Sequence, residues 1–378
     1  MNGKRWEYVI VGGGIYGVAT AWHLSRGGSE VLLLESRTIA SGASGGLGKR
    51  GVRANGRDIR ELPLMRAAYD IWPSLESELG HPTGWEPVGH LRLYERHHDV
   101  GAATARARVQ SEAGIPTQHL DLDAAREIEP GLSDVVLGAL HCPHDGVADH
   151  KATTLGYAAR AREAGAEIRE GAEVVGLEVG GGRIVAVLLE DGERIEVGRD
   201  VLLLNNAGVA DLLFDTFDRR LPVWSIFPQA MATEPTAEAP FRSLFGHEHR
   251  PLALKMLPDG SVMLSGGWRG RRNPETGEGE TLPAAVAGNW AEAVRIFPVL
   301  EGLELVTARA DRAEASCVDD IPIIDRLPEA PNLLFATGWS GHGWAIAPAV
   351  APLIAEGARA GSAPELLRPF GLGRFGSG

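Results

Sequence analysis

The chain has 378 residues, a formal net charge of −13, 44% hydrophobic residues and 23% charged residues. This length is sufficient for two or three domains with their own cores, and the composition is that of an ordinary globular protein. Two cysteines exclude a disulfide framework or a four-cysteine metal site, and the acidic balance argues against nucleic-acid binding. With neither an uninterrupted 18-residue apolar stretch nor a leader-like segment, we expect a cytoplasmic protein without a membrane span.

The N-terminus shows a strand, a glycine turn, a helix and a second strand in succession. Residues 8–11 are apolar and β-branched, which predicts a buried strand, and residues 12–17 (GGGIYG) match G-x-G-x-x-G. Residues 18–26 predict a helix, and residues 31–34 predict a second buried strand that ends at Glu35. The complete unit is typical of a dinucleotide-binding fold, whereas an isolated glycine motif would not be.

Each residue type in this unit has a physical reason to be there. Gly12 permits the tight turn, Gly14 lets a pyrophosphate approach the backbone, and Gly17 lets the helix pack closely against the strand. Glu35 is placed to accept hydrogen bonds from ribose hydroxyls and would repel a 2′-phosphate, which argues against NADP. The pattern leaves NAD and FAD open. We expect the dinucleotide to contact Gly12, Gly14, Ile15, Tyr16, Gly17, Glu35 and Ser36.

Two further glycine-rich segments bear on the choice between NAD and FAD. Residues 41–53 form a loop too rich in glycine and serine to be a helix, placed where exposed N–H groups can wrap a second phosphate. Residues 333–337 predict a strand, residues 338–344 (GWSGHGW) a loop, and residues 345–358 a helix. The N-terminus of that helix is suited to stabilise negative charge on a reduced flavin.

The GGGIYG, SGASGG and GWSGHGW segments together resemble the D-amino-acid oxidase family of FAD enzymes over essentially the whole chain. The resemblance is nearest to the branch of sarcosine oxidase β-subunits and amino-acid dehydrogenases. It implies noncovalent FAD and oxidation of a C–N bond by hydride transfer to flavin N5, with an imine product. The implied fold is α/β, with an interrupted Rossmann-type FAD-binding domain and an α+β substrate domain whose antiparallel sheet lies over the flavin.

We place the FAD-binding domain at residues 1–80, 151–210 and 305–378, and the substrate-binding domain at residues 81–150 and 211–304. The resemblance also extends the set of cofactor contacts, although Asn205-Asn206 departs from the small residues usual before Ala-Gly. The added residues are Ser44, Gly45, Gly48, Val174, Ala207, Gly208, Gly338, Gly341, His342 and Gly343.

Hydrophobic periodicity and turn residues predict the remaining elements. The predicted helices span residues 54–78, 97–113 and 152–164. The predicted strands span residues 84–93, 173–179, 183–189, 201–204, 223–227, 231–233, 252–257 and 261–268. Residues 269–280 are polar and glycine-rich, and we expect a loop there.

Four residues are candidates for substrate or flavin-edge roles. Lys255 is one of only four lysines and interrupts an apolar strand. Related oxidases carry a lysine on this sheet for oxygen activation, but strand alternation also allows Lys255 to face solvent. Arg53 follows the glycine loop near the implied flavin edge, where it suits either a carboxylate or a surface ion pair. Trp268 and Trp344 are candidate aromatic walls or ordinary core residues.

Two departures from the family bear on the substrate. Ala345 stands where monomeric sarcosine oxidases have a carboxylate-binding lysine, and Glu314 stands where glycine oxidases have a carboxylate-binding arginine. Both changes remove positive charge. We therefore hypothesise a substrate other than a simple small amino acid held by those anchors, such as a larger or more cationic secondary amine.

The sequence offers no convincing metal site. The segment around His141, Cys142, His144 and His150 matches no common zinc spacing, so no metal is predicted. Cys317 lies too close to the Asp-Ile-Pro segment to match the covalent flavin attachment of some relatives. The electron acceptor is left open between O2 and a partner protein. Two alternatives stay open: a FAD-dependent 2-hydroxy-acid dehydrogenase, and a FAD-binding electron-transfer subunit of a heteromeric complex.

Overall fold

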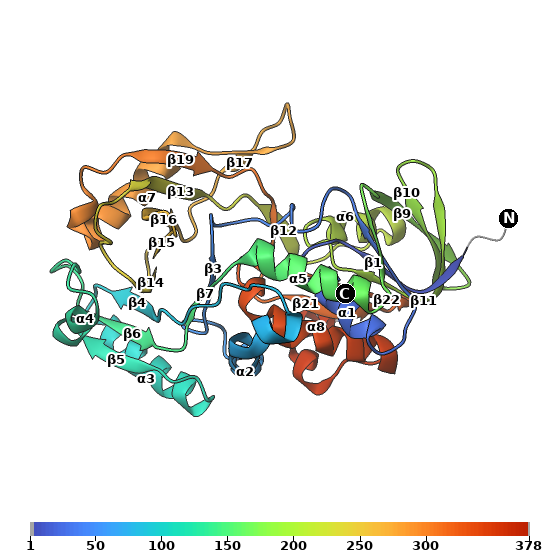
Figure 1. The fold of residues 1–378 in the computed structure, drawn as a ribbon, viewed down its shortest axis with the longest axis horizontal. Coiled ribbons are helices and arrows are strands. Elements are labelled where there is room, and N and C mark those ends of the chain that lie inside the picture. The colour runs from blue at the N-terminus through green and yellow to red at the C-terminus, as the bar shows by residue number, and fades with distance from the viewer. Residues whose placement is uncertain (1–3, 377–378) are drawn as a thin grey trace.

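The structure is a computed structural model that describes residues 4–376, and its backbone is built around two eight-stranded sheets (Figure 1). The first sheet has a parallel centre ordered β22-β11-β1-β2-β8, with β21 antiparallel at one edge and a β9–β10 hairpin branching from β11. Its strands are β1 (Arg5–Val11), β2 (Val31–Glu35), β8 (Glu167–Glu170), β9 (Val174–Gly180), β10 (Arg183–Leu189), β11 (Arg194–Leu203), β21 (Ile323–Leu327) and β22 (Ala330–Thr337).

Helices cover both faces of this first sheet, because its strands are apolar on both sides. In β1, Tyr8 and Ile10 pack into one core with the helices α1, α2, α5 and α8, while Val9 and Val11 pack into a second core with α6. The helices are α1 (Ile15–Ser25), α2 (Leu62–Leu79), α5 (His150–Glu163), α6 (Gly208–Phe217) and α8 (Gly343–Ala360). The arrangement is the predicted Rossmann-type domain, assembled from three separated chain segments.

The second sheet has its own core and runs in the order β19-β13-β16-β15-β14-β4-β6-β5. Its strands are β4 (His90–Tyr94), β5 (Gln118–Asp121), β6 (Gly138–Cys142), β13 (Ala230–Pro235), β14 (Leu244–His247), β15 (Ala253–Met256), β16 (Ser261–Ser265) and β19 (Leu305–Arg309). The accompanying helices are α3 (Asp99–Glu112), α4 (Leu122–Ile128) and α7 (Pro283–Ile296). All neighbours in it are antiparallel except β14 and β4. The predicted antiparallel sheet differs from it at this parallel pair and at residues 223–227, which pair with β20 outside this sheet.

Short elements connect the two sheets and complete the chain. The two-stranded pairs are β3 (Arg50–Val52) with β7 (Gly146–Ala148), β12 (Val223–Ile226) with β20 (Glu314–Cys317), and β17 (Arg271–Arg272) with β18 (Gly279–Glu280). The 3-10 helices are η1 (Pro298–Leu300), η2 (Glu365–Phe370) and η3 (Leu372–Phe375). Within residues 4–376, none of the helices combines the length and the apolar character needed to cross a bilayer.

Several predicted elements differ from the structure, for example the strand predicted over residues 201–204, which begins at Arg194. The helix predicted over residues 54–78 begins only at Leu62, because the N–H groups of Ala54 and Asn55 donate to the buried carboxylate of Asp145, at 2.6 and 3.1 Å. The strand predicted over residues 84–93 is restricted to β4, since two glycines before it have positive φ. The loop predicted over residues 269–280 contains the β17–β18 hairpin.

Two of the predicted domain boundaries conflict with the observed elements. The boundary between residues 210 and 211 falls inside α6, whose buried residues pack on the first sheet. The boundary at residue 305 assigns β19 to the FAD-binding domain, but β19 pairs with β13 in the second sheet. We therefore propose that the first boundary lies after the end of α6 and the second after the end of β19. The other boundaries stay predictions.

Candidate FAD and substrate site

A cavity of about 1470 Å³ is lined by residues from both sheets and the connections between them. This volume exceeds the roughly 300–1,000 Å³ of ordinary small-molecule sites, so it has room for a dinucleotide together with a substrate. The N-cap residues of three helices line it. They are Gly14 for α1, Ala207 for α6 and His342 for α8. Unpaired N–H groups at such helix starts favour negatively charged ligand groups.

The glycines of the N-terminal motif have the geometry that phosphate binding requires. Gly12 has φ +111°, and a Cβ there would lie 2.9 Å from the backbone of Asn205. A Cβ on Gly17 would lie 1.8 Å from the carbonyl oxygen of Gly12, so only glycine lets α1 pack this closely. A Cβ on Gly14 would meet nothing within 4 Å, which leaves the backbone of the turn open to the cavity.

Glu35 is held at the end of β2 by backbone donors. Its Oε2 accepts a hydrogen bond from the Gly13 N–H at 2.6 Å, and its Oε1 accepts one from the Arg37 N–H at 3.0 Å. Glu35 and the following Ser36 both line the cavity. The carboxylate is therefore fixed beside the glycine turn, as the nucleotide-binding pattern predicts.

The C-terminal glycine loop contacts the N-terminal helix directly. The Tyr16 ring stacks on Trp339, with centroids 3.8 Å apart and planes inclined by 10°, and its hydroxyl donates to the Gly343 carbonyl at 2.6 Å. The neighbouring His342 lines the cavity, and burial together with Arg53 holds its pKa well below the ordinary value. Segments more than 300 residues apart thus form one wall of the cavity.

Most predicted cofactor residues lie in this wall. The ones that line the cavity are Gly12, Gly14, Ile15, Tyr16, Glu35, Ser36, Ser44, Gly45, Ala207, Gly208, Gly341, His342 and Gly343. The ones that do not line it are Gly17, Gly48, Val174 and Gly338. Gly17 acts through packing, as predicted, whereas the Cα of Gly48 faces Leu257 and that of Gly338 faces Cys317 and Val223. Val174 begins β9, in the hairpin at the edge of the first sheet.

Lys255 lies in β15 and lines the cavity with only 6% of its surface exposed. Burial, with a contribution from the nearby Arg50, lowers the pKa of its ammonium to about 7. The interpretation in which strand alternation turns Lys255 to bulk solvent is therefore wrong. A titrating cation in the wall of a ligand cavity is a candidate functional group.

Arg53 also lines the cavity, but no carboxylate lies within ion-pair distance of it among residues 4–376. Its guanidinium donates to the Asn55 carbonyl at 3.2 Å, and burial together with Arg57 and Arg92 lowers its pKa to about 10. Arg57 itself is neutralised by Glu61 at 2.9 Å, with both side chains 1% exposed. The alternative of a surface ion pair for Arg53 is therefore wrong.

Both candidate tryptophans line the cavity. Within the described part of the chain, the buried indole N–H groups of Trp268 and Trp344 have no hydrogen-bond partner. Trp344 also packs against Trp72 and His150, with ring centroids 5.1 and 5.0 Å away, so it belongs to the core as well as to the cavity wall.

The two positions that depart from the family have different surroundings. Ala345 is 1% exposed in the core, and its carbonyl accepts a hydrogen bond from the Trp72 indole at 2.8 Å. Glu314 lines the cavity, where Asn206 donates to its Oε1 at 2.9 Å and the Ser44 hydroxyl donates to its Oε2. Burial raises the Glu314 pKa although both donors oppose that shift. Glu314 thus links two segments predicted to bind the cofactor.

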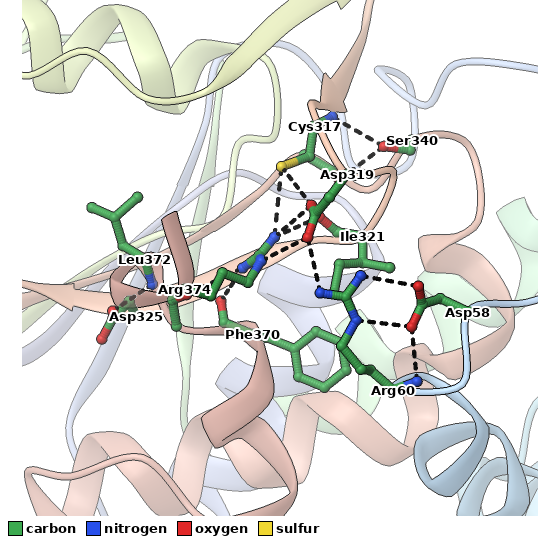
Figure 2. Close-up of polar contacts among 12 residues, drawn as sticks. Asp58, Arg60, Cys317, Asp319, Ile321, Asp325, Ser340, Phe370, Leu372 and Arg374 are labelled. Atoms are coloured by element: carbon green, nitrogen blue, oxygen red, sulfur yellow. Dashed lines mark hydrogen bonds and ion pairs between the residues drawn. The ribbon is translucent and has the colours of Figure 1, made fainter. Parts of the chain in front are cut away.

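A polar network fastens the C-terminus beside the cavity (Figure 2). The Asp319 carboxylate binds Arg374 through two hydrogen bonds of 3.0 Å and also accepts one from Arg60 at 3.0 Å. Cys317 is fully buried, donates to Asp319 at 3.2 Å and does not line the cavity. Burial raises the pKa of Asp319, but the hydrogen bonds from Arg374 and Cys317 outweigh it and hold the pKa at about 2.

One group within residues 4–376 has the spacing of metal ligands, and it is not the one considered from the sequence. It consists of Glu95, His247 and His249, with 3.3 Å between His247 Nε2 and Glu95 Oε1. Arg250 already binds the Glu95 carboxylate at 2.5 and 2.8 Å, which competes with a cation. This group is an ion-pair network at the end of β4 and β14.

The family of the chain is decided by its sequence match. Residues 7–357 match the profile of the DAO family, described as FAD dependent oxidoreductase. The chain belongs to this DAO family. The predicted family, the α/β fold class and the FAD cofactor are thereby confirmed.

Three relatives illustrate the position of this DAO-family chain. Sarcosine oxidase subunit beta of Rhodobacter capsulatus is 24% identical, over 99% of this chain and 90% of its own length. Glycine oxidase of Bacillus licheniformis is 24% identical, over 93% of each chain. The solved structure of L-proline dehydrogenase from P. horikoshii is 26% identical, has a TM-score of 0.89 and covers 98% of both chains.

The residues of this DAO-family chain fit FAD on structural grounds as well. The open backbone at Gly14, the three helix starts and the Glu35 carboxylate match the needs of a diphosphate and a ribose. Several buried polar side-chain atoms of the cavity wall have no hydrogen-bond partner among residues 4–376, as expected where a polar ligand binds. They include atoms of Asn205, Asn206, Trp268, His342 and Trp344.

Sequence reasoning missed the arginines that surround Arg53. Arg57, Arg92 and Arg106 all line the cavity. The i,i+4 spacing of Arg57 and Glu61 was a usable signal for this ion pair, but spacing alone does not show that the pair is buried. Arg92 and Arg106 carry no local signal, because only the packing of β4 and α3 turns them toward the cavity.

Proposed function

We propose that this DAO-family chain uses noncovalently bound FAD to oxidise the C–N bond of an amino acid or N-substituted amino acid, with an imine as product. The proposal rests mainly on the surroundings of Arg53. Its guanidinium lines the same cavity as the glycine motifs, and no carboxylate of residues 4–376 lies within ion-pair distance of it. The names of the relatives support it, since sarcosine, glycine and proline all carry a carboxylate beside an amine.

Bound FAD supplies the two-electron acceptor, and the chain supplies position and electrostatics. Arg53 binds the substrate carboxylate through two parallel N–H···O bonds, which fixes the nitrogen-bearing carbon in one orientation. The positive charge of Arg53, which no carboxylate of residues 4–376 neutralises, lowers the pKa of a substrate ammonium close to it. This charge therefore favours the neutral amine, which is the form that gives up a hydride.

Trp268 and Trp344 are proposed as the apolar part of the substrate pocket, where they exclude water from the reacting carbon. This arrangement favours an anionic group on the substrate over the cationic amine considered from the sequence. Ala345 and Glu314 occupy the positions where relatives have a carboxylate-binding lysine or arginine. In this chain, arginines of the 53–57 turn and its neighbours supply positive charge to the cavity instead.

We further propose O2 as the electron acceptor, with Lys255 as the cation that assists its reduction. The support is a buried lysine in the cavity wall whose pKa lies at about 7. The alternative of an electron-transfer subunit has support in the relatives named sarcosine oxidase subunit beta. The cytoplasmic location expected from the sequence stays a prediction.

Anaerobic reduction of the FAD-loaded protein tests the proposal. Samples are mixed with N-alkyl amino acids, simple amines and the matching 2-hydroxy acids, and the flavin absorbance is followed. We expect amino acids to bleach the flavin and the hydroxy acids to leave it unchanged; the reverse result would establish the hydroxy-acid dehydrogenase instead. When air is admitted, an oxidase recovers its colour, whereas persistent bleaching would assign electron transfer to a partner protein.

A further inference from the structure

The turn formed by residues 53–57 holds three arginine side chains against its own backbone. The Arg53 carbonyl accepts a hydrogen bond from Arg57 Nε at 2.6 Å, and the Asn55 carbonyl accepts one from Arg53 Nη1 at 3.2 Å. The Arg57 carbonyl accepts one from Arg106 Nη1, at 3.4 Å, across from helix α3. All three arginines line the cavity, so one short turn fixes three guanidinium groups in its wall.

Among the described residues, only one of these three guanidinium groups has a carboxylate partner. Arg57 is paired with Glu61, and Arg92, a fourth arginine of the same wall, is paired with Glu248. Arg53 and Arg106 have no carboxylate oxygen within 4.0 Å among residues 4–376. Positive charge in a partly buried site is costly unless an anion compensates it. The wall therefore suits a ligand with more than one negative charge.

The two unpaired groups are held by the same turn. The carbonyls of Asn55 and Arg57, which accept the hydrogen bonds from Arg53 and Arg106, are two residues apart in the chain. Two carboxylates on one short carbon skeleton offer one negative charge to each group. A guanidinium is well matched to a carboxylate, because its planar fork donates two parallel hydrogen bonds.

We infer that the substrate is an amino dicarboxylate or an N-substituted amino dicarboxylate. Its first carboxylate, next to the nitrogen-bearing carbon, binds Arg53, and its distal carboxylate binds Arg106. The inference rests on the proposed C–N oxidation, to which it adds the substrate class. Arg106 is then the residue that selects dicarboxylates over monocarboxylates.

Binding and turnover of matched ligands test this inference with the FAD-loaded protein. Acetate, malonate, succinate, glutarate and inorganic phosphate are titrated while the flavin absorbance is followed. N-methylglycine is compared with N-methylaspartate and N-methylglutamate in turnover. We expect the preferred dicarboxylate to bind at least about tenfold more tightly than acetate, which is the effect of about 1.4 kcal/mol. The preferred N-methyl dicarboxylate has the higher kcat/KM.

Two variants test whether the preference for dicarboxylates depends on Arg106. Arg106→Gln is expected to reduce kcat/KM and affinity for dicarboxylates about tenfold more than for monocarboxylates. Arg108→Gln is the matched control, because Arg108 lies on the same helix, is 80% exposed and pairs with Glu112. It is expected to keep the dicarboxylate preference.

The outcomes separate this inference from the proposed function. Equal turnover and binding of mono- and dicarboxylates by the wild-type protein, or a preference retained in Arg106→Gln, would overturn the dicarboxylate assignment while C–N oxidation stands. Tighter binding of phosphate than of any dicarboxylate would also overturn it. Failure of every amine to reduce the flavin would sink the proposed function, and the titrations would still decide whether the cavity prefers dianions.

Discussion

The burial of individual side chains affects their charge in the cavity. Lys255 is 6% exposed, and its pKa is lowered to about 7 by burial and by Arg50, so its ammonium and amine forms coexist near neutral pH. Arg53 keeps its charge, because a pKa lowered to about 10 still lies above neutrality. The cavity thus combines a permanent cation with one that titrates.

The first prediction concerns Lys255 and oxygen. Because a cation stabilises the negative charge that develops on reduced oxygen, reoxidation depends on the protonated form. That form is lost as the pH rises through about 7, so the rate at which O2 reoxidises the reduced protein is expected to fall between about pH 6 and 8. Stopped-flow mixing of the reduced protein with O2 measures this rate.

Lys255→Met is expected to react slowly with O2 at every pH. Lys151→Met is the control, since Lys151 is exposed at the start of α5 and should leave the wild-type pH profile intact. A wild-type rate that stays constant from pH 6 to 9 would contradict the role given to Lys255.

The second prediction concerns the buried pair of Arg57 and Glu61. Glu61→Gln leaves the Arg57 guanidinium buried without a counter-charge, which typically costs about 3–5 kcal/mol of the free energy of unfolding. Urea unfolding monitored by circular dichroism measures this. Glu78→Gln removes an ion pair with Arg26 in which both side chains are nearly half exposed, and it should cost less than about 1 kcal/mol. Equal losses in the two variants would show that burial of the first pair does not matter.

Single elements of the fold position the cofactor motifs, and helix α1 shows how. Its N-terminus is fixed by Gly17 against the Gly12 carbonyl, while Gly14 borders open space in the cavity. Packing and ligand binding are therefore assigned to different glycines of one motif. The spacing G-x-G-x-x-G predicts both roles, because they depend on local backbone geometry.

The third prediction separates these two roles by substitution. Gly17→Ala forces α1 away from β1, so it should lose both stability and FAD. Gly14→Ala meets no protein atom within 4 Å and has ordinary backbone angles, so it should fold normally but retain much less FAD. Thermal unfolding and the flavin-to-protein absorbance ratio measure the two effects.

Gly101→Ala is the control for these variants, since Gly101 lies in α3, far from the motif in sequence, and a methyl group added there would meet nothing within 4 Å. It should leave FAD retention unchanged and slightly raise stability. Full FAD retention by Gly14→Ala would contradict the assignment of the pyrophosphate to this turn.

The fourth prediction concerns the C-terminal segment held by Asp319 (Figure 2). The Asp319 pKa of about 2 lies below its unfolded value, so its ionised form stabilises the fold above about pH 4 and this contribution is lost as the pH falls toward 2. Asp319→Asn removes the contacts to Arg374 and Arg60. The variant should unfold at a lower temperature at pH 7, and the difference from wild type should shrink toward pH 2. A constant difference over that range would contradict the assigned ionisation.

At the scale of the whole molecule, the sequence predicted most of the cofactor half of the cavity but only part of the substrate half, namely Arg53, Lys255, Trp268 and Trp344. The glycine segments around residues 12–17 and 338–344 have signatures in local spacing, and both line the cavity. Arg106 and Arg92 have none, because they reach the cavity from a helix and a strand whose orientation depends on tertiary packing. The parallel pairing of β14 with β4 was missed for a similar reason, since LFGH is too short to show a period.

The measurement that tests the central claim most directly is the effect of deuterium on flavin reduction. The FAD-loaded protein is mixed anaerobically with its best amine substrate, in which the hydrogen on the nitrogen-bearing carbon is either protium or deuterium, and single-turnover reduction is followed. Oxidation of the C–N bond by hydride transfer breaks this C–H bond, so the deuterated substrate should reduce the flavin several-fold more slowly. Identical rates at saturating substrate would contradict hydride transfer from that carbon as the step that reduces the flavin.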